Sequence, residues 1–181
     1  MQDICIAPVR ISNKELLQRI ILELRKILLV EIKIVDLKLD LNKAYSHDRR
    51  QYYSTQVIAD ALNLTERLKG KVVILVDFDL YIPVFTYVFG EAQLNGKHSI
   101  VSLCRLHEEF YTGRTNEELL FERAAKEILH ELGHNFGLLH CSNWDCVMHA
   151  STDIEEVDIK GKVYCIDCRR LLQSVFNFRR N

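Results

Sequence analysis

The sequence has no hydrophobic run that approaches the ~18 consecutive apolar residues required for a membrane-spanning helix. At the N-terminus, Asp3 interrupts the only short apolar stretch, and no basic region or small-residue cleavage site accompanies it. The sequence therefore predicts a protein without a secretory signal or a membrane partner, located in the cytoplasm.

An excess of one charge is also missing, because 24 basic and 25 acidic residues leave a net charge of −1. This balance gives no overall attraction to nucleic acid or to anionic lipid. Four basic residues near the C-terminus are interpreted as the solvated end of a helix rather than as a nucleic-acid site, since basic groups suit a helix C-terminus. They are Arg169, Arg170, Arg179 and Arg180.

Proline and glycine are scarce, with two and seven residues, and no low-complexity linker divides the chain. The 181 residues, 48% of them hydrophobic, suffice for one domain split into two lobes around a cleft. We expect a monomer with a single domain, residues 1–181.

Apolar spacing alternates between the strand and helix periods in the first half of the chain. Helical spacing follows Ser12 and Glu15, which are expected to form a capping box, and a second helix is expected from about Ser54 to Leu68, stopped by Gly70. Strands are expected at 4–9, 31–39 and 71–76, the last as a central buried strand. This order predicts a mostly parallel sheet.

Two more strand candidates, 83–89 and 99–103, flank the turn signal Asn95-Gly96 and are expected to fold back as a hairpin at the sheet edge. A second capping box, Thr115 with Glu118, opens a helix through Leu132 that carries the motif described next. The predicted fold class is α/β: a mostly parallel twisted sheet with an antiparallel edge strand, an active-site helix and a small C-terminal lobe.

The stretch from His130 to His140 has the residues of a catalytic zinc site. His130 and His134 lie one helical turn apart, so both rings leave the same face and can reach one zinc ion. Glu131 is rotated by about 100° from His130, where a general base can face the open side of the metal. A bare HExxH pattern also arises by chance in helices, so the residues after it are decisive.

Gly137 supplies the additional information. A continuing helix would carry residue 140 away from the metal, whereas glycine tolerates the left-handed conformation that ends a helix. The chain can then return His140 as a third ligand. Three imidazoles leave one position for water, which is the open geometry of a catalytic zinc. Glu131 would take the proton of that water.

Four of the six cysteines are crowded into the C-terminal part, as Cys141, Cys146, Cys165 and Cys168. Two pairs separated by a longer loop match a tetrahedral four-thiolate zinc site, whose role would be structural. The alternatives are two disulfides or a CxxC redox motif. A reducing cytosol favours zinc, and no thioredoxin-like strand precedes the second pair. Cys5 and Cys104 stand alone and are expected to be small buried residues.

Met148 follows Cys146 by two residues. It is interpreted either as plain core filling or as a Met-turn, whose thioether forms an apolar floor beneath zinc-binding imidazoles. The histidine motif favours the Met-turn.

Together, the stretch from His130 to Cys141, with Cys146, Met148 and the pair Cys165 and Cys168, resembles the archaemetzincin family of zinc proteases. The wider metzincin pattern is HExxHxxGxxH followed by a Met-turn. One departure is that sixteen residues separate Met148 from Cys165, one fewer than is usual in the family, which affects loop length only.

The resemblance implies two zinc ions per chain. His130, His134 and His140 would bind the catalytic zinc, Glu131 would act as general base and acid, and Met148 would form the Met-turn. Cys141, Cys146, Cys165 and Cys168 would bind the structural zinc. The resemblance also implies an upper lobe, 1–137, and a lower lobe, 138–181. Peptide substrates would bind in extended form along an edge strand within 85–93.

The remaining polar residues are interpreted as structural rather than functional. Asp77 and Asp79 are expected to be loop caps or salt-bridge partners, and His149 could form a hydrogen bond near the site. His47, His98 and His107 are expected to be ordinary surface or core residues. Two functions compete: a zinc peptidase, and a zinc-stabilised peptide-binding module without turnover. The presence of Glu131 favours the peptidase.

Overall fold

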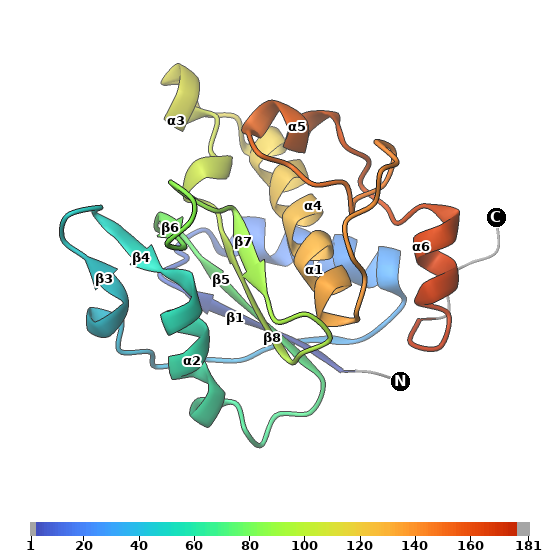
Figure 1. Cartoon of the computed structure of the whole chain (residues 1–181), viewed down its shortest axis with the longest axis horizontal. Coiled ribbons are helices and arrows are strands. Elements are labelled where there is room, and N and C mark those ends of the chain that lie inside the picture. Colours follow the sequence, from blue (N-terminus) through green and yellow to red (C-terminus); the bar gives the residue numbers. More distant parts are fainter. Residues whose placement is uncertain (1–2, 177–181) are drawn as a thin grey trace.

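A five-stranded sheet forms the centre of the computed structural model, which describes residues 3–176 (Figure 1). Its strand order is β2-β1-β5-β8-β7, with β7 alone antiparallel to its neighbour. The predicted mostly parallel sheet, the central position of the strand at 71–76 and the hairpin at the edge are therefore confirmed. The sheet strands are β1 (Ile4–Val9), β2 (Ile32–Ile34), β5 (Lys71–Val76), β7 (Gly90–Ala92) and β8 (His98–Ser102).

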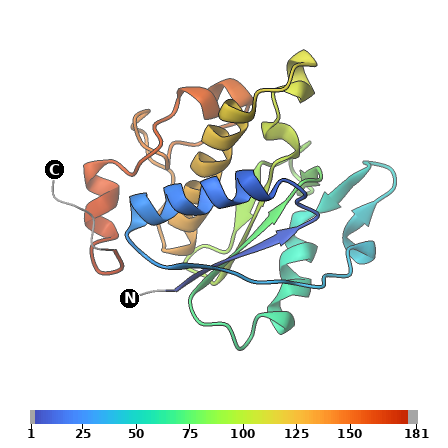
Figure 2. The same ribbon diagram turned by 180° about the vertical axis from the view of Figure 1, so that it is seen from behind.

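Helices cover both faces of this sheet. On one face, α1 (Lys14–Leu28) and α4 (Glu117–Asn135) pack together over the strands, and Figure 2 shows this face with α1 in front of them. On the other face lies α2 (Ser54–Leu64). The alternation of side chains along β5 explains the two layers, because Val73 and Leu75 join the core under α1 and α4, whereas Ile74 and Val76 join the core under α2.

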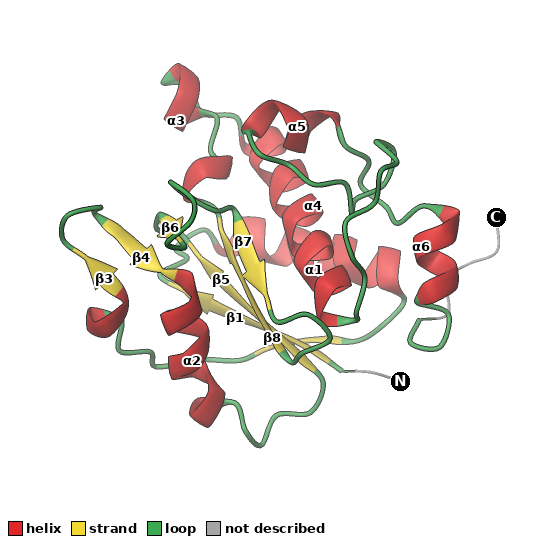
Figure 3. Cartoon of the chain, in the orientation of Figure 1, coloured by secondary structure: helices red, strands yellow, loops and turns green. Residues whose placement is uncertain are grey.

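Smaller elements complete the fold. A second sheet of three short strands, which the sequence did not suggest, consists of β3 (Tyr45–Ser46), β4 (Gln51–Tyr53) and β6 (Leu80–Tyr81). The chain after α4 consists mostly of loops with two short helices (Figure 3). The remaining helical elements are η1 (Asn42–Ala44), η2 (Cys104–Leu106), α3 (Glu109–Thr112), α5 (Ile154–Ile159) and α6 (Ile166–Leu171).

Two predicted strands are wrong in extent. The strand expected at 31–39 ends at Ile34, since Leu37 and Leu41 leave the sheet and bury themselves in the core under α2. The strand expected at 83–89 is a turn-containing loop, in which Phe85 N–H donates to the Ile82 carbonyl, and the edge strand starts only at Gly90. Pro83 lacks the N–H that a strand ladder uses.

The helix boundaries also differ from the predictions. Asn13 and Asn116 cap α1 and α4, accepting from the backbone N–H of Leu16 and Leu119, so the capping boxes predicted at Ser12 and Thr115 are wrong by one residue. Helix α2 ends at Leu64 rather than at 68, and Thr65 is its C-cap, with both its backbone N–H and its hydroxyl donating to the Ala61 carbonyl.

The basic C-terminal residues divide into two groups. Arg169 and Arg170 lie in the last turn of α6, in agreement with their interpretation as the end of a helix. Arg179 and Arg180 lie outside the described residues. Within residues 3–176, no helix is long and apolar enough to span a membrane.

Candidate metal centre and cleft

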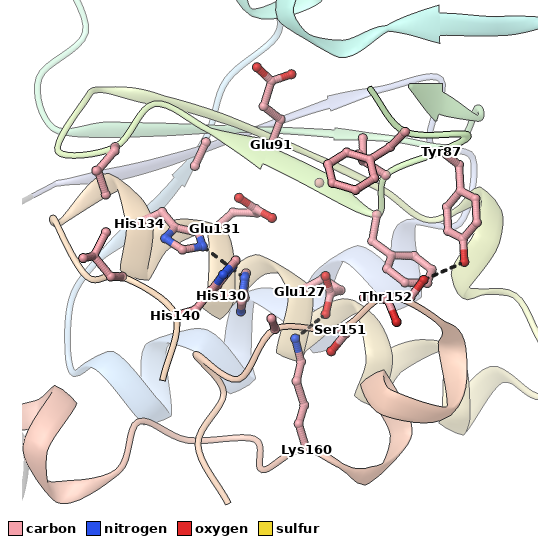
Figure 4. Close-up of a pocket in the computed structure, with 18 of the residues that line it drawn as sticks. Tyr87, Glu91, Glu127, His130, Glu131, His134, His140, Ser151, Thr152 and Lys160 are labelled. Atoms are coloured by element: carbon pink, nitrogen blue, oxygen red, sulfur yellow. Dashed lines mark hydrogen bonds and ion pairs between the residues drawn. The ribbon is translucent and has the colours of Figure 1, made fainter. Parts of the chain in front are cut away.

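The three motif histidines converge on one point beside the sheet (Figure 4). His130 and His134 leave the same face of α4, and their Nε2 atoms are 3.1 Å apart. The ring of His140 lies 5.3 Å from that of His130 and 4.9 Å from that of His134, centroid to centroid. One nitrogen from each ring lies within 4.8 Å of the others.

Gly137 brings His140 to this point. Its φ of +91° is in the left-handed region. The N–H of Leu138 donates to the Gly133 carbonyl at 2.9 Å, and the N–H of Gly137 donates to the His134 carbonyl at 2.9 Å. These two bonds form the Schellman motif that ends a helix and reverses the chain.

Backbone carbonyls orient two of the three imidazoles. His130 Nδ1 is 2.8 Å from the Val147 carbonyl, and His134 Nδ1 is 2.8 Å from the Leu138 carbonyl. Because a carbonyl only accepts, each Nδ1 carries the proton and each Nε2 presents a lone pair. Burial lowers the pKa of all three histidines, that of His130 well below its usual value. The rings are therefore neutral at pH 7, the form in which imidazole binds metals.

These distances fit a zinc ion. With Zn–N bonds of ~2.0–2.1 Å, a tetrahedral site separates its nitrogens by about 3.3 Å, close to the 3.1 Å between the Nε2 atoms of His130 and His134. The donor set is the three-imidazole set of catalytic zinc sites, with the fourth position open.

Glu131 lies buried beside the histidines and is 5% exposed. Its Oε2 has no hydrogen-bond partner among the described residues. Burial, and secondarily the charge of Glu127, raises the pKa of Glu131 well above its usual value. Strand β7 passes close to this side chain: a Cβ added at Gly90 would lie 2.6 Å from Glu131 Oε1. Glycine in the edge strand therefore leaves the space that this carboxylate occupies.

The four cysteines predicted to form a second site also converge. Their Sγ atoms lie within 4.8 Å of one another, with 3.9 Å between Cys141 and Cys165 and 3.7 Å between Cys146 and Cys168. None is in a disulfide, for which the sulfurs would lie about 2.05 Å apart. Zn–S bonds of ~2.3 Å imply sulfur–sulfur separations of about 3.8 Å, so the four thiols fit a closed tetrahedral zinc site.

Met148 lies directly beneath the motif helix. It is fully buried, and a Cβ added at Gly133 would lie 2.2 Å from its Sδ. The backbone N–H of Cys141 donates to the Met148 carbonyl at 2.9 Å, which ties the segment after the third histidine to the Met148 turn. The sulfur therefore packs against the helix backbone at Gly133, next to His134.

The close approach of Met148 to the helix predicts that one substitution has different costs in two backgrounds. Gly133→Ala should destabilise the protein by about 1 kcal/mol, because overpacking costs about 1–3 kcal/mol and the gain in helix propensity returns only about 1 kcal/mol. In a Met148→Ala background only Tyr164 Cε1 remains close, 3.2 Å from the added Cβ, so the same substitution should cost less. Urea unfolding of the four proteins measures both effects, and an equal cost in both backgrounds would refute the packing argument.

A cavity of about 540 Å³ extends along the histidines between the edge strand and the loop after Met148. The exposed apolar side chains of Phe85, Leu94 and Leu139 lie at its rim. Of the predicted peptide-binding segment 85–93, residues 85–92 line the cavity, although only Gly90–Ala92 is a strand. Its remaining lining includes α4 residues, residues 150–152 and Lys160.

The other polar residues have structural contacts, as expected. Asp79 forms a salt bridge with Arg105 at 2.7 Å, and Asp77 pairs with His107 at 3.3 Å. His98 is buried against the Thr65 hydroxyl at 2.6 Å. His47 packs on the ring of Tyr45, and His149 Nδ1 donates to the Cys141 carbonyl at 2.9 Å. Cys5 is buried as expected, whereas Cys104 is only half-buried.

One pair in the cavity escaped the sequence analysis. Glu127 and Lys160 form an ion pair at 2.7 Å, and both line the cavity. Glu127 precedes Glu131 by four residues, so the two side chains share one helix face. This spacing could have indicated from the sequence that Glu127 lies near the site. Nothing in the sequence around Lys160 pointed to the cavity, because a loop far from α4 in the chain brings it there.

Comparison with known proteins agrees with this geometry. The model of the family described as Peptidase family M54 matches residues 11–174. The archaemetzincin of Pyrococcus horikoshii is 39% identical over 149 residues, 80% of this chain and 79% of that protein.

Solved structures are similar over almost the whole chain. The crystal structure of archaemetzincin from Methanopyrus kandleri has a TM-score of 0.80 and 33% identity, covering 96% of this chain and 94% of that one. A structure titled as a zinc-dependent peptidase, from Methanocorpusculum labreanum, has a TM-score of 0.82 and 28% identity, covering 93% of this chain and 99% of that one.

Proposed function

This chain belongs to peptidase family M54 and is a zinc metallopeptidase, and we propose that it hydrolyses peptide bonds through a zinc-activated water with Glu131 as general base. Peptides or proteins are its substrates. One observation carries the proposal: three neutral imidazoles converge within 4.8 Å beside a buried carboxylate oxygen that has no partner among the described residues.

Each residue has a distinct task in this reaction. His130, His134 and His140 would hold the catalytic zinc, which supplies Lewis acidity and lowers the pKa of water when bound. Glu131 accepts the proton of the attacking water and later gives a proton to the leaving amine. Burial raises the pKa of Glu131 well above its usual value, which strengthens the carboxylate as a base toward the proton of the water.

The cysteine cluster and Met148 support the site from below. Cys141, Cys146, Cys165 and Cys168 would hold a second, structural zinc, which gives two zinc ions per chain. This site would fix the segment that begins directly after His140 and therefore the position of the third ligand. Met148 would keep the floor beneath the imidazoles apolar.

Removing the metal tests the proposal. Incubation with a chelator should first release one zinc per chain, with loss of cleavage of a mixed peptide library, and added Zn²⁺ should restore cleavage. Metal content measured by atomic spectroscopy and products read by mass provide the two readouts. Full cleavage by zinc-free protein would contradict the proposal.

The competing function is a zinc-stabilised module that binds peptides without cutting them. A single tightly held zinc, with peptide binding but no products, would favour that function. The partnerless carboxylate oxygen of Glu131 argues against it, because a binding module gains nothing from a buried acceptor that lacks a donor.

Three further properties are proposed with the function. The chain would act in the cytoplasm as a monomer, without binding nucleic acid or membranes. The cleft would divide an upper lobe, 1–137, from a lower lobe, 138–181.

A further inference from the structure

The ion pair between Glu127 and Lys160 has no task in the reaction proposed above, yet it lies in the wall of the cleft. The side chains of Glu127 and Lys160 are 4% and 0% exposed, and both line the cavity beside His130 and Glu131. Figure 4 shows Lys160 pointing toward Glu127, with Ser151 and Thr152 beside the pair. Removing two charges from water costs several kcal/mol per ion, so a buried pair is weak evidence for a role in stability.

Holding the C-terminal segment against α4 does not require this pair, because neighbouring residues already do so. Arg123 forms a salt bridge with Asp158 at 2.7 Å, and the Lys126 ammonium donates to the carbonyls of Val157 and Asp158. Lys162 pairs with Glu122 at 2.9 Å on the half-exposed side of the same helix. The buried pair is therefore redundant as a tether.

The polar atoms around the pair are left short of hydrogen bonds. Glu127 Oε1 contacts the Lys160 ammonium at 2.7 Å without hydrogen-bond geometry, and it has no hydrogen-bond partner among residues 3–176. The Ser151 Oγ atom is also shielded from solvent, and it too has no hydrogen-bond partner among the described residues. The Lys160 ammonium has three donors, and its other neighbour, the His149 carbonyl, is at 3.5 Å. Buried polar groups are normally satisfied, so these atoms indicate a missing polar ligand.

The charge of the pair decides what that ligand is. Glu127 and Lys160 together are neutral, so an acidic or basic side chain beside them would leave one uncompensated charge in a buried place. A neutral group with both a donor and an acceptor matches both partners. A carboxamide can donate to the Glu127 carboxylate and accept from the Lys160 ammonium, with the Ser151 hydroxyl as a third contact.

We propose that the Glu127, Lys160 and Ser151 side chains form a subsite for a glutamine or asparagine side chain of the peptide, next to the bond that is cut. This inference rests on the proposed function. The Tyr87 hydroxyl donates to the Thr152 carbonyl at 3.1 Å, joining the upper and lower rims of the cavity beside the subsite.

Matched peptides test the subsite. Peptides that differ only in one residue flanking the scissile bond would carry glutamine, methionine, glutamate or lysine, and kcat/KM would be measured with the zinc-loaded full chain. We expect glutamine to exceed methionine, its apolar counterpart of similar length, by about tenfold or more at one of the two flanking positions. Equal values for glutamine and methionine, or a preference for glutamate or lysine, would overturn the proposal.

Variants identify the residues responsible. Glu127→Leu combined with Lys160→Met removes both charges without leaving an unpaired one, and it should reverse the preference in favour of methionine. Glu122→Leu with Lys162→Met provides the matched control, because it removes an ion pair of the same helix outside the cavity and should keep the glutamine preference. Should the buried double variant fail to fold, Ser151→Ala, which is expected to reduce the preference severalfold, still tests the subsite. An unchanged ratio in Ser151→Ala and in a folded double variant would refute the assignment.

A binding measurement separates failure of the subsite from failure of the peptidase proposal. If no peptide is cut, the proposed function fails, and the subsite is then tested by fluorescence anisotropy of the same labelled peptides on zinc-loaded Glu131→Gln. Tighter binding of the glutamine peptide than of the methionine peptide would support the subsite in the absence of turnover. Equal Kd values would overturn it.

Discussion

Glu131→Gln is expected to lower kcat for any cleavable peptide by roughly 100- to 10,000-fold, the usual contribution of a general base. The amide keeps the size of the carboxylate but cannot accept a proton. Both metals should stay bound, because the zinc ligands proposed for this site are His130, His134 and His140 and not Glu131. Single-turnover kinetics with metal analysis of the same sample would measure both effects.

The matched control is Glu122→Gln on the same helix. Glu122 pairs with Lys162 at 2.9 Å outside the cavity, so its neutralisation should leave cleavage unchanged. Turnover by Glu131→Gln at the rate of this control would remove Glu131 from the mechanism. Loss of zinc from Glu131→Gln would show instead that the carboxylate contributes to metal binding.

The second large effect concerns stability. Replacing Cys165 and Cys168 by serine should lower the zinc content from two ions to one and the free energy of unfolding by at least about 3 kcal/mol. This is a modest share of the roughly 10–16 kcal/mol by which a structural zinc binds in zinc-finger peptides. Denaturant unfolding and metal analysis would measure the change. Cleavage should fall as well, because Cys141 follows His140 directly and loses its fixed position.

The cysteines outside the cluster supply the control. Cys5 and Cys104 lie far from the other four in sequence and are not part of the converging group. Their replacement by alanine should release no zinc. Unchanged stability and two bound zinc ions in the variant lacking Cys165 and Cys168 would exclude the four-thiolate site.

Local patterns in the sequence were reliable where one element decides the geometry. The spacing of His130 and His134 on a helix, the reversal at Gly137 and the central valine-rich strand at 71–76 were all predicted, and the structure contains them. They depend on helical pitch, on backbone sterics and on the burial of an apolar run, which act between residues near one another in the chain. The same local rules failed at helix ends, where Asn13 and Asn116 compete with adjacent capping residues.

Contacts between distant segments could not be predicted in this way. Leu37 follows a strand-like alternation, yet it is buried under α2 as irregular chain, because covering that core outweighs pairing at the sheet edge. Gly90 approaches Glu131 only because the hairpin folds over α4.

The sequence by itself determined the chemistry of this protein: three imidazoles, one carboxylate and four thiols at spacings that a helix, a turn and two cysteine pairs can use. The tertiary structure alone decided how the cleft is lined, since it set Lys160 against Glu127 at 2.7 Å and enclosed both in the wall. The physical reason is that ligand spacing is a property of local backbone geometry. The burial of a charge depends on which remote segments pack around it.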